Sequence, residues 1–428
     1  MVRICLLSYR GNPFCGGQGV YLYHLSRYLA EKGHQITVLV GPPYPPEMPW
    51  AKVIKIKNEN FITRPGKEAI PKDNPFKVFQ PGNLVELGLS RLGSNPEMLF
   101  FSLRAFQIIK RFFREGERFD LVHDNQSLGY GLLLIKQLGI PVVATIHHPL
   151  QVDRKEDLKQ MPEFTKQMKR CLYYPLWMQK LVARRLDALL TVSETSRQLV
   201  SRWYKIPPSK IKKIYNGIDL SRFRPLTDIK KIPGRIIFVG STEDRKKGIL
   251  YLLRALKMLS HPEAHLIIVD GRLNPQRVYA KNLVKQMGLV RKVKFLEKIS
   301  EEDLLKEYNL AQVSVVPSLF EGFGLPALEA MSCGIALIAS RVGALVEVVG
   351  EGEEAGGILV NPGDEKALAK EIDRVLIDDK LRAELERKAR ARAERYFSWK
   401  ESARKVEEVY QEVLSKGGKK AGRGFYGA

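Results

Sequence analysis

Short apolar runs rich in β-branched residues alternate along this chain with longer segments whose apolar positions recur at helical spacing. The first unit consists of the run 2–8, a glycine-rich turn, the helical segment 19–33 and a second run at 34–41. Gly33 stands where a glycine ends a helix. Because this alternation is typical of parallel strands joined by crossover helices, it predicts a doubly wound α/β fold.

The same alternation continues in two series. In the first half, strands are predicted within DLVH (120–123), PVVATI (141–146) and ALLTVS (188–193). The proline-rich stretch 42–97 interrupts this series, and we assign it to the rim of a ligand cleft because long irregular segments in compact domains are usually functional. The second series has five runs of strand length, at 235–240, 265–271, 292–298, 312–318 and 335–340.

The polar segment 215–233 contains prolines and no sustained periodicity, as expected at a domain boundary. We therefore predict two domains, 1–224 and 225–398, followed by a C-terminal segment, 399–428. A helix that crosses back to the first domain is expected to begin this segment. Its basic, glycine-rich end from Lys416 onward is expected to be disordered.

Composition narrows the class of protein. The chain has 428 residues, of which 44% are hydrophobic, so it is long enough for two cores. It shows neither a secretory signal nor an apolar stretch of the roughly 18 residues that a membrane span needs. The four cysteines lack the spacing of zinc or disulfide motifs, and Cys5 and Cys333 are predicted to be core residues. We therefore expect a cytoplasmic protein.

The formal net charge of +23 requires an anionic partner, which could be a nucleotide, an acidic lipid surface or nucleic acid. The stretch PSLFEGFGLPALEAMSCG (317–334) favours the nucleotide, because it follows a predicted strand at the edge where open α/β sheets bind ligands. Gly322 and Gly324 allow the backbone to approach a ligand closely, and Pro326 suits the first turn of a helix. Glu321 and Glu329 then offer acceptors to sugar hydroxyls, beside the amides of a helix N-terminus that can bind a diphosphate.

A second anion site is predicted where the strand 235–240 leads into Arg245, Lys246 and Lys247 and then into a helix opened by Gly248. Preorganised donors here would stabilise the charge that develops on a departing nucleoside diphosphate. A polar turn and a solvated run of charges are the alternative interpretations of these two segments.

Together, the motifs E-G-F-G-L-P-x-L-E, A-M-S-C-G and the upstream K-K-G resemble those of family 4 of the retaining glycosyltransferases, and the similarity covers nearly the whole chain. It implies the GT-B fold, in which two Rossmann-like, doubly wound parallel-sheet domains face a cleft. It also implies transfer of a hexose from a nucleotide-diphosphate sugar to a hydroxyl acceptor with retention of configuration, in glycan or glycolipid biosynthesis.

Carried over by residue, the resemblance implies that Glu321 binds donor-sugar hydroxyls, that Glu329 binds the ribose and that the backbone of Gly322, Phe323, Gly324 and Leu325 lines the donor. Family members usually have Gly-Arg after the first strand of this domain, whereas this chain has Gly240 and Ser241. Which of Arg245, Lys246 and Lys247 binds the diphosphate is therefore open, and Lys247 is preferred because it precedes a glycine. The predicted donor-binding set is Gly16, Gly17, Ser241, Arg245, Lys246, Lys247, Glu321, Gly322, Phe323, Gly324, Leu325 and Glu329, and the predicted catalytic set is His147, Glu321 and Lys247.

In the first domain, Gly16 and Gly17 match the family's glycine turn, which approaches the donor phosphates. His147 matches a histidine that faces the transferred sugar, although adjacent His148 leaves open which imidazole does so. Because no metal-binding motif stands out and the loop is cationic, we expect no cofactor and no metal requirement.

The acceptor, whether a sugar, a polyol or a lipid, is not specified. Two basic segments with aromatic residues, 98–119 and 164–186, could contact an anionic membrane at its inner surface, although such stripes are more often helices packed on a sheet. The alternative functions are a GT-B epimerase or phosphorylase, a noncatalytic nucleotide-sugar sensor and a nucleic-acid-binding protein. The last lacks a recognisable binding module, and no nucleic acid is expected as a partner.

Overall fold

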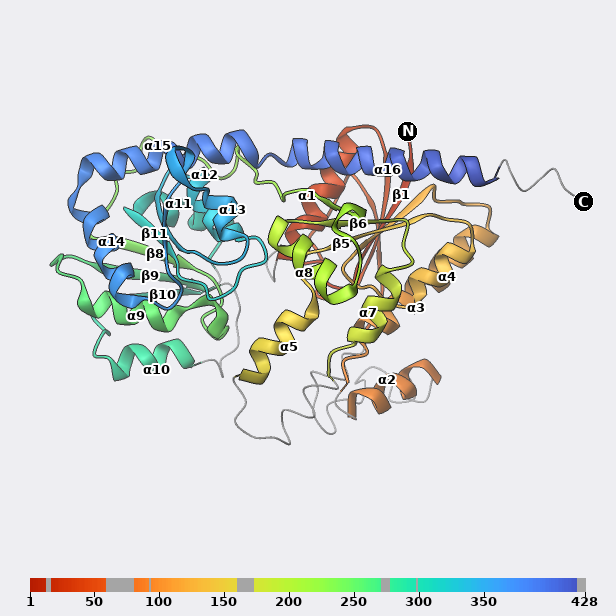
Figure 1. The fold of residues 1–428 in the computed structure, drawn as a ribbon, viewed down its shortest axis with the longest axis horizontal. Coiled ribbons are helices and arrows are strands. Elements are labelled where there is room, and N and C mark those ends of the chain that lie inside the picture. Colours follow the sequence, from red (N-terminus) through yellow and green to blue (C-terminus); the bar gives the residue numbers. More distant parts are fainter. Residues whose placement is uncertain are drawn as a thin grey trace, which may run out of the picture. The chain divides into compact units, whose positions relative to one another are not determined.

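The computed structural model describes residues 1–12, 17–58, 81–91, 94–159, 173–270, 278–297 and 299–421. They form two compact units, each built on one parallel sheet with helices packed on it (Figure 1). Unit 1 comprises Met1–Val192, Ser196–Ile214 and Ala403–Ala428, and unit 2 comprises Ser193–Thr195 and Tyr215–Ser402. The predicted pair of doubly wound α/β domains is confirmed.

The sheet of unit 1 has seven parallel strands in the order β3-β2-β1-β4-β5-β6-β7. They are β1 (Arg3–Ser8), β2 (Gln35–Val40), β3 (Lys52–Lys55), β4 (Leu121–Asn125), β5 (Val142–Ile146), β6 (Ala188–Thr191) and β7 (Ile211–Lys213). Its helices are α1 (Gly17–Glu31), α2 (Pro81–Arg91), α3 (Glu97–Arg114), α4 (Gly131–Gln137), α5 (Leu150–Lys159), α7 (Leu176–Ala183) and α8 (Glu194–Tyr204), the first two residues of α8 falling in unit 2. A short 3-10 turn, η4 (Pro208–Lys210), precedes β7.

The sheet of unit 2 has six parallel strands in the order β10-β9-β8-β11-β12-β13. They are β8 (Arg235–Val239), β9 (His265–Asp270), β10 (Val293–Glu297), β11 (Val313–Val316), β12 (Ala336–Ser340) and β13 (Ile358–Val360). Its helices are α9 (Ile249–Met258), α10 (Tyr279–Gln286), α11 (Glu301–Leu310), α12 (Leu325–Ser332), α13 (Leu345–Val349), α14 (Glu365–Ile377) and α15 (Asp379–Tyr396), with the 3-10 turns η5 (Arg245–Lys247) and η6 (Gly352–Glu354).

The last helix, α16 (Trp399–Ala421), begins in unit 2 and belongs to unit 1 from Ala403 onward. Within unit 1, the hydroxyl of Tyr410 lies 2.5 Å from Nδ1 of the buried His123. The helix continues to Ala421, so the expectation of disorder from Lys416 onward is wrong for the residues up to that point.

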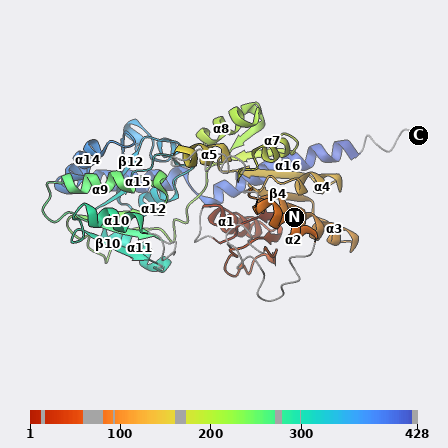
Figure 2. The same ribbon diagram turned by 90° about the horizontal axis from the view of Figure 1, so that it is seen from below.

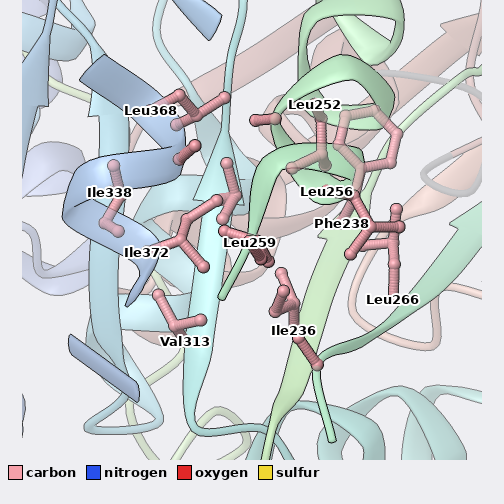
Figure 3. Packing of buried hydrophobic residues seen from close by; sticks show 14 of the residues in the cluster. Ile236, Phe238, Leu252, Leu256, Leu259, Leu266, Val313, Ile338, Leu368 and Ile372 are labelled. Atoms are coloured by element: carbon pink, nitrogen blue, oxygen red, sulfur yellow. The ribbon is translucent and has the colours of Figure 1, made fainter. Parts of the chain in front are cut away.

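Each core lies where apolar helix faces meet the alternating side chains of buried strands. In unit 2, α9 and α14 cover one face of the sheet, seen from close by in Figure 3, and Figure 2 gives a second view of the ribbon. The residues labelled in Figure 3 are Ile236, Phe238, Leu252, Leu256, Leu259, Leu266, Val313, Ile338, Leu368 and Ile372. Cys5 and Cys333 are buried, as expected.

The segment 42–97 is less irregular than its prolines indicate. It contributes β3, which pairs in parallel with β2 at the edge of the sheet, and the helix α2. Residues 59–80 lie outside the described residues. Of the two basic aromatic segments, α3 buries Met98, Phe101 and Ile109 in the core of unit 1, so its apolar stripe is packed on the sheet. No helix among the described residues is long and apolar enough to cross a membrane.

Candidate functional site

In each sheet the strand order reverses between two neighbours, β1 and β4 in unit 1 and β8 and β11 in unit 2. Connections leave the two strands toward opposite faces of the sheet, so the loops at their carboxyl ends diverge and leave room for a ligand. In unit 2, the predicted site residues follow β8 and β11 themselves. In unit 1, the glycine turn follows β1, and His147 follows β5, the next strand beyond β4.

The loop after β8 is fixed by contacts at both of its ends. Asp270, at the end of β9, accepts hydrogen bonds from the amide of Thr242 at 2.8 Å and from its hydroxyl at 2.7 Å. At the other end, Gly248 adopts φ 72°, and a Cβ at this position would lie 1.8 Å from the carbonyl oxygen of Pro317. Only glycine permits both this conformation and this approach. The constraint delivers Lys247, the preceding residue, to the loop that follows β11.

Lys247 and Glu321 form an ion pair within unit 2. The Lys247 ammonium lies 3.0 Å from Oε1 and 2.7 Å from Oε2 of Glu321, and the Ser318 hydroxyl donates to Oε2 at 3.3 Å. The side chains are 27% and 11% exposed, so solvent screens this pair less than a surface pair. The two candidate segments of the sequence thus meet at one place, which holds a cation and a carboxylate together.

The backbone of Glu321 is held from behind by the segment before α13. Its carbonyl accepts a hydrogen bond from the amide of Ala344 at 3.1 Å. Gly343 has φ 51°, and a Cβ there would lie 2.3 Å from the same carbonyl oxygen. In addition, the amide of Leu319 donates to the carbonyl of Lys246 at 2.7 Å, which ties the two loops together. The position of the Glu321 carboxylate is therefore determined by three backbone segments.

In the loop from Gly322 to Leu325, the backbone rather than the one aromatic side chain is available to a ligand. Phe323 is buried, and its ring packs 6.2 Å from that of Tyr215 and 6.0 Å from that of Phe397. Gly324 adopts φ 97° and is the N-cap of α12, with Pro326 in the first helical turn as predicted. Helix N-terminal amides of this kind are available to anionic groups.

Glu329, on α12, is half-buried, and its carboxylate accepts a hydrogen bond from the hydroxyl of Tyr308 at 2.9 Å. The protein atoms packed around this carboxyl raise its pKa, and the Tyr308 hydrogen bond and the nearby Arg222 counteract that rise. Arg222 itself forms an ion pair with Glu301. The pKa of Tyr308 is raised by burial and by the adjacent carboxylate, so this phenol remains a donor.

The structure distinguishes the three candidate cations. The Arg245 guanidinium lies over the ring of Tyr279, 5.1 Å from its centroid, and Arg245 is exposed. Lys246 joins the loop contacts through its backbone, whose amide also donates to the Asp244 carboxylate at 3.1 Å. Ser241 is half-buried on the same loop. Lys247 is the one of the three whose ammonium contacts Glu321.

In unit 1, Gly16 lies outside the described residues, and Gly17 is the first residue of α1. His147 is 8% exposed, and its Nε2 lies 2.7 Å from Oδ1 of Asn125. Burial, together with the smaller effects of His148 and His123, lowers the pKa of His147 to about 3, so the ring is neutral at physiological pH. His148 is half-buried and instead pairs with Asp153 of α5 at 2.9 Å.

Three residues in contact with the predicted site escaped the sequence analysis, namely Tyr308, Asn125 and Gln126. The predicted strand 120–123 ends two residues before β4 does, so the polar residues at its carboxyl end received no role. A polar run directly after a buried strand was the signal that could have identified Asn125 and Gln126. Tyr308 gives no such signal, because its place on α11 is typical of a core residue.

Two family profiles match the chain. "Glycosyltransferase Family 4" matches residues 15–222, and "Glycosyl transferases group 1" matches residues 222–392. The chain is 36% identical to MMP alpha-(1->4)-mannosyltransferase of Mycolicibacterium hassiacum over 97% of this chain and 99% of that protein. It is similar in structure to a sucrose-phosphate synthase of Thermosynechococcus elongatus, with 26% identity, a TM-score of 0.74 and coverage of 97% and 100% of the two chains. A structure of Anabaena HepE in complex with UDP and glucose has the same fold, with 19% identity, a TM-score of 0.67 and coverage of 96% and 100%.

Proposed function

Because the chain belongs to glycosyltransferase family 4, with a C-terminal half of the glycosyl transferases group 1, we propose that it transfers a hexose from a nucleotide-diphosphate sugar to a hydroxyl acceptor with retention of configuration. The observation that carries this proposal is the Lys247–Glu321 pair, which stands at the carboxyl ends of β8 and β11 in the GT-B fold.

Each member of the pair has a part in this reaction. The Lys247 ammonium binds the diphosphate and stabilises the charge that develops as the nucleoside diphosphate departs, an effect worth several kcal/mol at a preorganised site. The Glu321 carboxylate accepts hydrogen bonds from hydroxyls of the transferred sugar. The pairing keeps each charge compensated before the donor binds.

Glu329 binds the ribose of the nucleotide. The Tyr308 hydrogen bond reaches one carboxylate oxygen, Oε2, and a carboxylate has acceptor capacity beyond a single donor. The backbone from Gly322 to Leu325 and the loop residues Ser241, Arg245 and Lys246 border the donor. In this proposal residues 225–398 form the donor-binding domain, residues 1–224 form the acceptor-binding domain, and Gly16, Gly17 and His147 face the donor from the latter.

The reaction is proposed to need no metal ion. In this proposal Lys247 supplies the positive charge at the diphosphate that a bound cation would otherwise provide. Full turnover in excess chelator, with a product whose one-bond carbon–proton coupling at the anomeric carbon shows the same configuration as in the donor, supports this proposal. An inverted product, or loss of turnover that Mg²⁺ or Mn²⁺ restores, contradicts it.

The first experiment is a screen for the donor. Calorimetry of the purified protein against UDP-, GDP- and ADP-linked hexoses, in chelator and with Glu329→Ala as control, should find one donor that the parent binds and the variant loses. Mannose-linked donors come first, because a relative that is 36% identical over 97% of this chain is named for mannosyl transfer. Absence of binding by every donor would contradict the assignment of the site.

The protein is proposed to act in the cytoplasm, with peripheral contact at the inner face of the membrane. The observation in favour of this contact is the surface of α7, where Trp177 is 82% exposed and Lys180 lies 5.7 Å from its ring centroid. An indole beside a cation suits an anionic lipid interface. Sedimentation with phosphatidylserine vesicles that Trp177→Ala reduces, and that phosphatidylcholine vesicles do not produce, tests the contact.

A further inference from the structure

A directional chain of hydrogen bonds leads to His147 within unit 1. The Ser8 hydroxyl donates to the carbonyl of Arg10 at 2.7 Å, which commits its proton. The Asn125 amide nitrogen donates to Ser8 Oγ at 3.1 Å and to the carbonyl of Gln18 at 2.9 Å. Because both neighbours of this nitrogen act as acceptors, the orientation of the Asn125 amide is determined, and its oxygen must face His147.

The orientation of Asn125 in turn determines the tautomer of His147. Asn125 Oδ1 is an acceptor, and it lies 2.7 Å from Nε2 of His147. A neutral imidazole carries one proton, so that proton resides on Nε2 and Nδ1 keeps its lone pair. Nδ1 of His147 has no hydrogen-bond partner among the described residues. It is also absent from the fully buried polar atoms that lack a hydrogen-bond partner, so it is not fully enclosed and a ligand hydroxyl can reach it.

The backbone around His147 is constrained by the same strand end. Gln126 Oε1 accepts from the amide of His147 at 2.6 Å, and its Nε2 donates to the carbonyl of His148 at 3.0 Å. Gln126 itself adopts φ 63°, and Leu128 adopts φ 48°, conformations that cost a non-glycine residue about 1–2 kcal/mol. Strain of this kind persists where the surrounding structure over-determines it, and it is common at ligand sites.

We propose that Asn125 is a positioning residue, which holds His147 as the Nε2–H tautomer and so presents Nδ1 as a hydrogen-bond acceptor to a hydroxyl of the donor sugar. This inference rests on the proposed function, because the ligand hydroxyl belongs to the sugar that is transferred. Through Gln18, the same amide also joins His147 to the first turn of α1, which follows the glycine turn.

The titratable neighbours of His147 do not obscure this role. Tyr21 of α1 lies edge-on to its ring, with the ring centroids 5.1 Å apart, and His123 of β4 is close enough to lower its pKa. Burial lowers the pKa of His123 to about 3 and raises that of Tyr21, so both are neutral between pH 5 and pH 9. The remaining neighbour is His148, which pairs with Asp153. Asp124, the residue before Asn125 on β4, has a pKa that burial raises to about 6, so it titrates in the same pH range. A pH effect of a change at residue 125 therefore reports on His147 only if it disappears when His147 is replaced as well.

The test introduces a carboxylate at position 125 and measures kcat and KM for the donor between pH 5 and pH 9. In Asn125→Asp, the buried carboxylate stabilises the imidazolium and should raise the pKa of His147 by ~3 units, the upper end of the usual range for an adjacent opposite charge, from about 3 into the measured pH range. Below the new pKa both ring nitrogens are protonated and the acceptor is lost, so kcat should fall ~10-fold toward pH 5 and recover as the pH rises. The parent should show no such decline.

Two controls separate positioning from a structural effect. Asn95→Asp places a carboxylate at another buried asparagine of unit 1, one that hydrogen-bonds to Tyr173 and, among the described residues, to no histidine; it should leave the parent's pH profile unchanged. Asn125→Asp combined with His147→Gln should lose the acid decline. The proposal is overturned if Asn125→Asp retains the parent's profile, or if the decline persists without His147.

Nuclear magnetic resonance gives a readout that does not depend on activity. In ¹⁵N-labelled parent protein, the imidazole signals that disappear in His147→Gln should show a protonated Nε2 and an unprotonated Nδ1. A protonated Nδ1 overturns the positioning role and leaves the proposed glycosyl transfer untouched. A parent that turns over no nucleotide sugar but shows the Nε2–H tautomer instead contradicts the proposed function and leaves the assigned tautomer intact.

Discussion

The ammonium of Lys247 lies 2.7 Å from a carboxylate oxygen of Glu321, although the two residues are 74 positions apart in the sequence. They meet because β8 and β11 are neighbours in the sheet, so the loops that leave their carboxyl ends begin side by side. The structure thus joins two motifs that the sequence presents separately, and the relation between them can be tested.

Replacing Lys247 by methionine should lower kcat ~10²–10³-fold, because the diphosphate loses its positioned donor as it departs. The donor's KM should change less than kcat, since the charge at the leaving oxygen is greatest in the transition state. Steady-state kinetics with the donor found in the screen measures both. Lys246→Met is the matched control. An equal or larger loss of kcat in that variant would show that Lys247 is not the lysine that binds the diphosphate.

Glu321→Gln should reduce kcat while leaving the melting temperature within a few degrees of the parent. The amide keeps the size of the side chain, but it loses one charge and leaves the partly buried Lys247 without its ion pair. Charge-assisted hydrogen bonds to sugar hydroxyls are about twice as strong as neutral ones, so a loss of ~10–100-fold is expected. Kinetics together with thermal unfolding measures this; a folded variant with the parent's kcat excludes a role for the Glu321 charge.

The fold and the motifs differ in how far the sequence predicts them. The strands β8, β9, β11 and β12 lie in the predicted runs because each is a largely apolar stretch that is buried over nearly all of its length. The edge strand β10 also lies in a predicted run, although none of its residues is fully buried. The three-residue strands β7 and β13 are not predicted, since a run that short has no periodicity. The edge strand β3 escapes for another reason: no residue in it is buried, and prolines surround it.

Among the site residues, Glu321 and Glu329 are found from local chemistry, but their partners are not. Tyr308 reaches Glu329 because α11 and α12 are brought together by the strand between them, a relation set by tertiary packing. Asn125 likewise acts through Ser8, 117 positions away, across the pairing of β1 with β4. Spacing along the chain carries no information on such contacts.

Glu329→Gln should weaken donor binding ~10-fold or more and yet stabilise the free protein at neutral pH. Burial raises the pKa of Glu329 above its usual value, so the folded state disfavours the charged form. The stability associated with this group is therefore present below the unfolded pKa and decreases as the pH rises through the folded pKa. Calorimetry of donor binding and melting curves at several pH values measure the two effects. A variant that is no more stable than the parent at pH 8 contradicts the argument from burial.

Gly343→Ala should reduce turnover by displacing Glu321. With φ 51°, an alanine at this position pays about 1–2 kcal/mol for its backbone conformation, and its Cβ would lie 2.3 Å from the Glu321 carbonyl oxygen. Because that atom is backbone, relief requires the loop to move, which carries the carboxylate away from its place beside Lys247. Gly33→Ala is the matched control. Gly33 has φ 85°, and a Cβ at this position would have no neighbouring atom within 4 Å, so that variant incurs the conformational cost without a clash. Thermal unfolding should show both variants destabilised, whereas kcat should fall in Gly343→Ala alone. If both variants keep the parent's kcat, the backbone contact behind Glu321 is not what positions its carboxylate for the donor.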